Sequence, residues 1–168
     1  MRAKTMFIGL CPGRNGADLT GVPFTKDPSG KVFFEVLDEL GYLNGGSPDR
    51  PLIRGAYVTN LVKCCPKDNL GRNRCPSSIE ISSCEEYLRA EIDILKPTLI
   101  LTLGRVATEL VLGRRITKFS DIHLKRIVKK DRTVVPLFHP SFVVRGAYPR
   151  SRYLRELGRL ANLTPTSK

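Results

Sequence analysis

The chain has 168 residues, and 41% of them are hydrophobic. This length and composition suffice for one domain with a hydrophobic core but not for two, so we expect a single domain over residues 1–168. No apolar run reaches membrane-spanning length and Met1 is not followed by a leader pattern, so we expect a cytoplasmic protein without a membrane partner. The net charge of +12 comes almost entirely from residues 114–168, which hold 14 Lys and Arg against 3 Asp and Glu. So much positive charge in one segment favours binding to nucleic acid over a role in solubility alone.

Short apolar runs and amphipathic segments alternate along the chain. Four runs have the character of buried strands: 5–10, 56–61, 98–103 and 134–138. Helices are predicted over 31–40, 77–95, 105–112 and 151–161, the second opening on a capping box and the first and third ending at a glycine. Residues 122–128 look like the first arm of a hairpin that leads into the last strand.

This alternation predicts an α/β fold. Strands joined through helices form a mainly parallel sheet that is covered on both faces. We therefore expect a three-layer α/β/α sandwich around a central four-stranded sheet. Ligands of such sheets bind beyond the carboxyl ends of the strands, so the residues that follow each strand are the first candidates for a site.

The segments that follow three of the strands carry chemistry. A long loop dense in Gly and Pro, residues 9–30, follows the first strand, Asn60 ends the second, and His139-Pro-Ser141 follows the fourth. The loop matches neither a phosphate-binding Walker loop nor a dinucleotide fingerprint, because its glycine spacing is wrong and no Gly-Lys-Ser/Thr follows. We expect these segments to meet at one edge of the sheet.

The same segments resemble motifs of the uracil-DNA glycosylases, in particular the fourth and fifth families, which carry iron-sulfur clusters. Residues 9–30 are similar to the fifth family's first motif, and residues 57–64 to the segment with its base-reading asparagine. Residues 84–88 and 101–107 resemble the central helix and third-strand signature, and 139–141 the second catalytic motif. The resemblance covers roughly residues 5–160. It implies hydrolysis of the bond between a damaged base and its deoxyribose.

Two residues take catalytic roles from this resemblance. Asp27 matches the carboxylate that orients the water and faces the cationic sugar; taken alone, an Asp before Pro-Ser-Gly is also typical of a turn or helix cap. Asp18 is the alternative carboxylate, since it lies nearer the place where other families carry their acid. His139 is predicted to donate a hydrogen bond to the base oxygen that becomes anionic, whereas His123, mid-hairpin, is expected at the surface.

Four residues are predicted to bind the base. Asn60 has an amide that both donates to and accepts from one edge of a pyrimidine, although a turn cap is its alternative role. Phe24 is placed to stack on an extruded base, with a core role as the alternative. Gly9 and Cys11 belong to the same active-site loop.

The segment after His139 is predicted to contact DNA. In relatives, side chains from the matching segment, here Phe142-Val-Val-Arg145, enter the vacated base stack, and Phe142 is among the predicted DNA contacts. Ser141 and Gly146 allow the backbone to approach phosphates, and Arg145, Arg150 and Arg152 are expected to supply a salt-sensitive electrostatic attraction to DNA.

The cysteines depart from the family pattern. The fourth and fifth families carry two further cysteines before the first motif, and these have no counterpart here. Cys64 and Cys84 match the remaining pair of family ligands, and Cys65 and Cys75 lie between them. An iron-sulfur cluster on Cys64, Cys65, Cys75 and Cys84 is one alternative; free thiols or a disulfide are the others. No cofactor is required for the chemistry itself.

The resemblance thus predicts a monofunctional, monomeric glycosylase that flips uracil out of DNA, with hypoxanthine or other deaminated bases as further candidates. The matched motifs show no catalytic lysine, so we expect no Schiff-base intermediate. A non-catalytic nucleic-acid-binding module on the same fold and a hydrolase of small nucleosides are the competing hypotheses.

Overall fold

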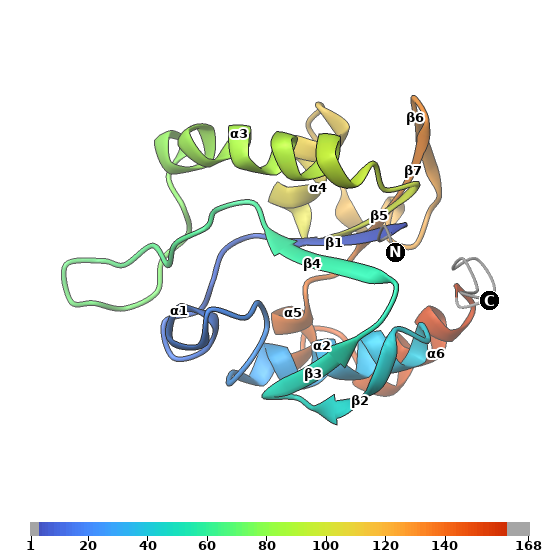
Figure 1. Cartoon of the computed structure of the whole chain (residues 1–168), viewed down its shortest axis with the longest axis horizontal. Helices are drawn as coiled ribbons and strands as arrows, with labels where there is room; N and C mark the ends of the chain where they lie inside the picture. Colours follow the sequence, from blue (N-terminus) through green and yellow to red (C-terminus); the bar gives the residue numbers. More distant parts are fainter. Residues whose placement is uncertain (1–3, 161–168) are drawn as a thin grey trace.

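A computed structural model describes residues 4–160 of the chain. Its centre is a five-stranded sheet in the order β4-β1-β5-β7-β6 (Figure 1). The strands are β1 (Thr5–Gly9), β4 (Ala56–Asn60), β5 (Leu99–Leu103), β6 (Ile127–Lys129) and β7 (Arg132–Leu137). All neighbouring pairs are parallel except β6 and β7. The parallel strands β1 and β5 are buried along their whole length, as expected for strands covered on both faces.

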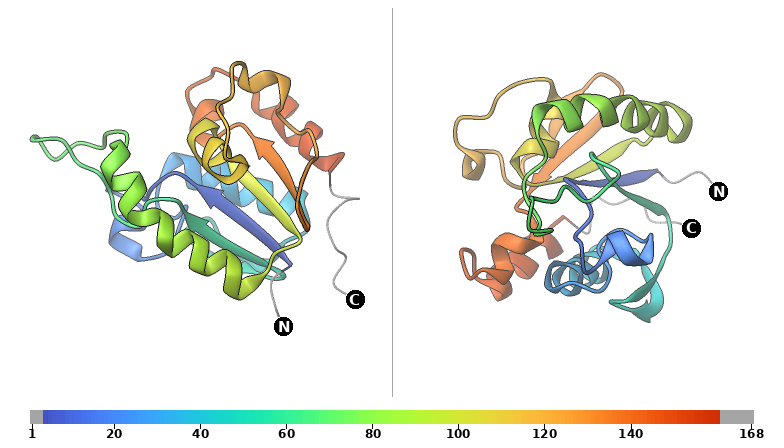
Figure 2. Two further views of the ribbon diagram at one scale, coloured as in Figure 1. Left: turned by 90° about the horizontal axis from the view of Figure 1, so that it is seen from above. Right: turned by 90° about the vertical axis from the view of Figure 1, so that its left-hand side faces the viewer.

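Helices cover both faces of the sheet and complete three layers (Figure 2, right). The helices are α1 (Ala17–Thr20), α2 (Pro28–Glu39), α3 (Ser78–Leu95), α4 (Arg105–Leu112), α5 (Pro140–Val144) and α6 (Arg150–Gly158), with a 3-10 turn, η1, at Phe119–Asp121. One core cluster joins α2, α5 and α6 to the sheet, and a second joins α3 and α4 to its other face. The predicted α/β/α sandwich is confirmed.

The predicted count of four strands is wrong, because β6 adds a fifth, antiparallel strand at the edge. The predicted hairpin arm 122–128 is also shorter than expected. Leu124 has a φ of 64°, in the left-handed region that a strand cannot contain, so pairing starts only at Ile127. A second, two-stranded sheet of β2 (Leu43–Ser47) and β3 (Arg50–Ile53) was not predicted, since two glycines interrupt its first strand.

The helix predictions are close to the observed bounds. Ser77 accepts a hydrogen bond from the backbone N–H of Glu80, whose side chain returns one to Ser77, so the predicted capping box is present at α3. The last helix begins one residue earlier than predicted, at Arg150, and ends at Gly158, so it is shorter at its end than predicted; the predicted end at Ala161 lies outside the described residues. Within residues 4–160 no helix is both long and apolar enough to cross a membrane.

Candidate active site

A cleft of about 730 Å³ lies at the carboxyl ends of the parallel strands. Its walls come from the loop after β1, the end of β4, the loop 61–77, the turn between β5 and α4, and the segment after β7. In Figure 1 these ends face left, where the loop 61–77 extends beyond the sheet. The volume is in the range of small-molecule sites, and it admits a nucleobase with its sugar.

Asp27 lines the cleft and caps α2 at the same time. Its Oδ1 accepts a 2.7 Å hydrogen bond from the backbone N–H of Gly30, in the third position of the helix. The other oxygen, Oδ2, has no hydrogen-bond partner among residues 4–160 and lies over Gly13 and Gly16. The two roles proposed from sequence, a cap and a carboxylate of the site, are thus compatible, since each uses a different oxygen.

The alternative carboxylate, Asp18, is engaged elsewhere. Its Oδ2 lies 2.8 Å from Nζ of Lys67 in the loop 61–77, and Asp18 is not among the residues that line the cleft. Of the two acids, only Asp27 borders the cavity in which a substrate can lie.

His139 repeats the arrangement of Asp27 at the first turn of α5. Its Nδ1 accepts a hydrogen bond from the backbone N–H of Ser141 at 3.1 Å, which places the proton of the neutral ring on Nε2. Burial lowers the pKa of His139 to about 4, and the charge of Arg145 acts in the same direction. The ring is therefore neutral near pH 7 and has an N–H donor free for a ligand in the cleft.

Acidification should destabilise the fold through both histidines. His123, expected at the surface, is instead buried, and burial lowers its pKa to about 4 despite the nearby Glu156. Because the unfolded chain takes up these protons near pH 6.5 and the folded chain only near pH 4, the free energy of unfolding should fall as pH drops through this window. Urea unfolding at a series of pH values measures this slope. The variant His139→Asn should show a shallower slope, and a flat wild-type profile would contradict the prediction.

Asn60 presents an unpaired amide oxygen at the end of β4. The residue is only 5% exposed, and its Oδ1 is a buried atom without a hydrogen-bond partner within the described chain. A buried acceptor of this kind costs free energy unless a ligand satisfies it. Asn60 lines the cleft, so the missing donor is expected from a molecule bound there.

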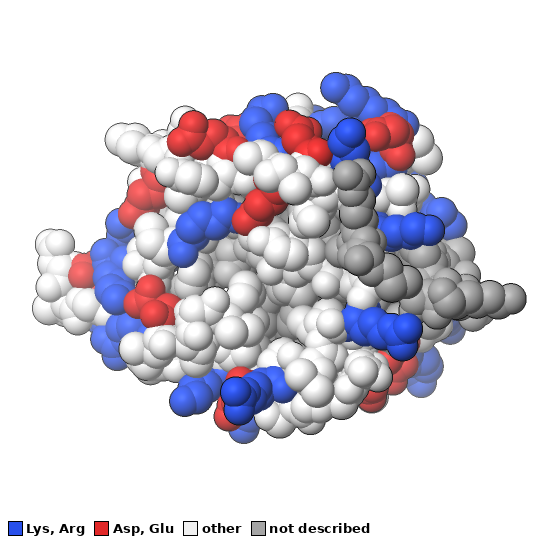
Figure 3. Space-filling view, in the orientation of Figure 1, with Lys and Arg blue, Asp and Glu red and all other residues white. Residues whose placement is uncertain are grey.

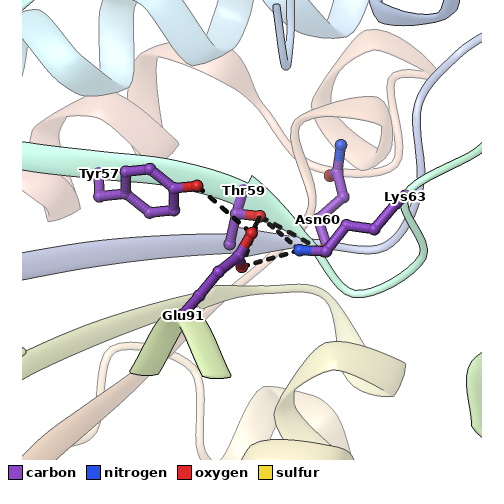
Figure 4. Close-up of polar contacts among 5 residues, drawn as sticks. All are labelled: Tyr57, Thr59, Asn60, Lys63 and Glu91. Atoms are coloured by element: carbon purple, nitrogen blue, oxygen red, sulfur yellow. Dashed lines mark hydrogen bonds and ion pairs between the residues drawn. The ribbon is translucent and has the colours of Figure 1, made fainter. Parts of the chain in front are cut away.

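A partly buried polar cluster fixes the backbone that carries Asn60. Nζ of Lys63 donates to the Asn60 carbonyl, to the hydroxyl of Thr59 and to the carboxylate of Glu91 on α3, each at 2.8 Å. Tyr57 donates to the same carboxylate at 3.3 Å. Figure 4 shows the Asn60 side chain projecting away from this cluster. The sequence did not reveal this support, because Lys63 and Glu91 are 28 residues apart.

Phe24 forms one wall of the cleft and is also part of the core. Its ring packs against Phe33, with centroids 4.3 Å apart, and lies 5.8 Å from the ring of His139. Its backbone is left-handed, with a φ of 59°, and so is that of Lys26, with a φ of 54°. Such conformations are strained for residues other than glycine and cluster at functional sites.

Gly9 lies where β1 meets Asn60 and Phe24. A methyl group at Gly9 would lie 2.4 Å from Oδ1 of Asn60 and 2.6 Å from Cζ of Phe24, which is too close for either atom. We expect Gly9→Ala to displace both side chains, to abolish ligand binding in the cleft and to lower stability by about 1–3 kcal/mol. Gly41→Ala is the control: its φ of 73° strains the backbone, but no atom lies within 4 Å of the new methyl group. Equal activity of the two variants would contradict this role for Gly9.

The predicted cluster ligands lie in the loop 61–77, which carries Cys64, Cys65 and Cys75, and in α3, which carries Cys84. Across residues 4–160 no three Cys, His, Asp or Glu side chains gather as a metal-binding group, and Cys11, Cys64, Cys65, Cys75 and Cys84 are free thiols. Cys11 lines the cleft, and burial, together with the nearby cysteines, raises the pKa of its thiol to about 12. Cys11 is therefore a protonated, neutral part of the wall.

The predicted DNA-contacting residues divide into two groups. Ser141 and Arg145 line the cleft, with Arg145 donating to the Ser141 hydroxyl at 3.3 Å. Phe142 is not a lining residue; it stacks on Phe138 with ring centroids 5.1 Å apart. Val144, from the same predicted segment 142–145, lines the cleft and is 44% exposed.

Cations border the cleft, although the basic residues of the chain do not all gather there. Exposed Lys26, Arg105 and Arg145 belong to its lining. On the face that Figure 3 shows, Lys and Arg are interspersed with Asp and Glu. The attraction of a polyanion to the cleft therefore depends more on the cations that line the cleft than on the net charge of the chain.

Comparison with known proteins assigns the family. A model of the uracil DNA glycosylase superfamily matches residues 1–158. The chain belongs to this superfamily. It is 29% identical to a type-4 uracil-DNA glycosylase of Sulfurisphaera tokodaii, over 99% of this chain and 73% of that protein, and 28% identical to one of Archaeoglobus fulgidus, over 96% and 77%. A type-5 uracil-DNA glycosylase of Pyrobaculum aerophilum is 33% identical over 84% of this chain and 62% of that protein.

Similarity to both type-4 and type-5 glycosylases agrees with the resemblance to the fourth and fifth families. The superfamily membership also confirms the resemblance drawn from the segments around Asp27, Asn60 and His139. These three residues line one cleft.

Proposed function

We propose that the chain hydrolyses the N-glycosidic bond between uracil and deoxyribose in DNA, leaving an abasic site. The observation that carries this proposal is the meeting of three groups in one cleft: the free carboxylate oxygen of Asp27, the Nε2 donor of His139 and the unpaired amide oxygen of Asn60. The type-4 and type-5 relatives support uracil as the base.

The chemistry follows from the two helix-capping residues. As the C1′–N1 bond lengthens, its electron pair moves to the base and positive charge builds on the sugar. Oδ2 of Asp27 stabilises that charge and orients a water. The water oxygen bonds to C1′, its proton passes to Asp27, and the base leaves as an anion whose oxygen accepts the Nε2–H of His139.

Asn60 reads the departing base. A buried amide oxygen accepts from a ring N–H, and the amide nitrogen donates to the adjacent carbonyl, which is the pattern that uracil presents on one edge. Phe24 offers its ring for stacking. Hypoxanthine also carries an N–H beside a carbonyl, so it is a second candidate base.

The base reaches the cleft only after leaving the duplex. Val144, exposed at the cleft, is better placed than the stacked Phe142 to enter the vacated position. Lys26 and Arg145 lie at the same cleft and are suited to contact the phosphates beside the flipped nucleotide, a grip that weakens with salt.

We propose that this chemistry needs no cofactor and that one copy of the chain suffices. Every group used above lies in a single chain. An iron-sulfur cluster stays a prediction for the purified protein, which the iron content and visible absorbance would decide. Size-exclusion chromatography tests the monomer.

A single-uracil oligonucleotide tests the function. The protein is incubated with the duplex and the product is heated in alkali, which cuts the strand at an abasic site. We expect scission at the uracil and none in a matched thymine duplex. Retardation of the DNA in a gel without scission would instead support a non-catalytic binding module, and release of uracil from free deoxyuridine would support a nucleoside hydrolase.

A further inference from the structure

We propose that Asn73, in the loop 61–77, holds the attacking water together with Asp27. This inference rests on the proposed function and adds a residue to it. Asn73 belongs to none of the matched motifs. It also does not directly follow a strand, because it lies in an extended loop thirteen residues beyond the end of β4.

The side chains of Asp27 and Asn73 both approach Gly13. A methyl group built on Gly13 would lie 3.5 Å from Oδ2 of Asp27 and 3.9 Å from Nδ2 of Asn73. The space above Gly13 is therefore bordered by one free acceptor and one free donor. All three residues line the cleft.

The orientation of the Asn73 amide is fixed by its oxygen. Oδ1 accepts from the backbone N–H of Arg14 at 3.2 Å and from the thiol of Cys65 at 3.4 Å. Two donors on one atom identify it as the oxygen, so Nδ2 is the atom near Gly13. Within residues 4–160 no acceptor pairs with Nδ2.

The loop itself is tied to the loop that carries Gly13. The guanidinium of Arg14 donates to the carbonyl of Gly71 at 2.7 Å, and Lys67 pairs with Asp18 at 2.8 Å. These contacts join the loop 61–77 to the loop after β1 at two places. Asn73 is thus held at a defined distance from the carboxylate.

One water satisfies both groups. It donates one O–H to Oδ2 of Asp27 and accepts a hydrogen bond from Nδ2 of Asn73. Its second lone pair stays free to bond with C1′, and Asp27 takes the proton as before. A water held by two groups is oriented for attack, whereas a water held by one is free to rotate.

Two variants test this role by different means. Asn73→Asp keeps the Oδ1 acceptor for Arg14 and Cys65 and removes the donor; Gly13→Ala fills the space with a methyl group at ordinary contact distances. We expect each to lower kcat for uracil excision by about tenfold or more, with KM and the melting temperature unchanged. Asn69→Asp, an exposed change in the same loop that adds the same charge, should keep wild-type kcat.

The outcomes separate this inference from the proposed function. Since both changes act on one water, Gly13→Ala with Asn73→Asp should be no slower than the slower single variant. A wild type that excises uracil, with both single variants at wild-type kcat, overturns the role of Asn73 and leaves the function standing. A rise in KM at constant kcat overturns it too, because Asn73 then contacts DNA. An inactive wild type overturns both proposals.

Discussion

Asp27→Asn should reduce the rate of uracil excision by about 10²- to 10⁴-fold, the usual worth of a positioned acid or base. The amide cannot take the proton of the water and carries no charge to balance the cationic sugar. Asparagine is as good a helix cap as aspartate, so the bond to the N–H of Gly30 and the stability of α2 should persist. Single-turnover cleavage and urea unfolding measure the two effects separately.

Asp27→Ala is the matched control for this variant. It removes both the free oxygen and the cap, so it should be as inactive as Asp27→Asn but less stable by about 1 kcal/mol. DNA affinity, measured by gel retardation, should be retained by both. Excision at the wild-type rate by Asp27→Asn would remove Asp27 from the mechanism.

His139→Asn should lower excision by about 10²- to 10³-fold, as the loss of one donor to a developing anion does in other enzymes. The shorter side chain can still accept from the N–H of Ser141 and cap α5, but it does not reach where the Nε2–H lies. Because the ring is already neutral far below pH 7, the wild-type rate should show no inflection near pH 6.5.

The comparison with His139→Ala separates the effect of losing the Nε2–H donor from the effect of losing the helix cap. Both variants lack the Nε2–H and should be equally slow, whereas only the alanine variant loses the cap on α5. Wild-type kinetics in His139→Asn, or a steep rise of the wild-type rate as pH falls through 6.5, would show that the neutral imidazole is not the donor.

The positions of these residues were predictable because parallel strands end at a common edge. Asp27, Asn60 and His139 lie far apart in sequence, and the order of the strands alone brings their segments to one cleft. The helix-cap role of Asp27 was also visible in the residues that follow it.

Other features depend on contacts that no local pattern encodes. The support of Asn60 by Lys63 and Glu91 requires the packing of α3 beside β4. Asn73 approaches Asp27 only through the ties between two long loops. The burial of His123 and the stacking of Phe142 likewise follow from how the segment after η1 and the start of α5 pack against Phe138.

The strand order has a consequence for how the molecule is made. β1 pairs with β4, 51 residues further along, and with β5, 94 residues further along, while His139 arrives later still. Contacts between such distant parts of a chain slow folding, and a ribosome must synthesise most of the protein before β1 has both neighbours. The cleft is consequently among the last features to form. A nascent or truncated chain that ends before β7 lacks His139, and we expect it to have no catalytic activity.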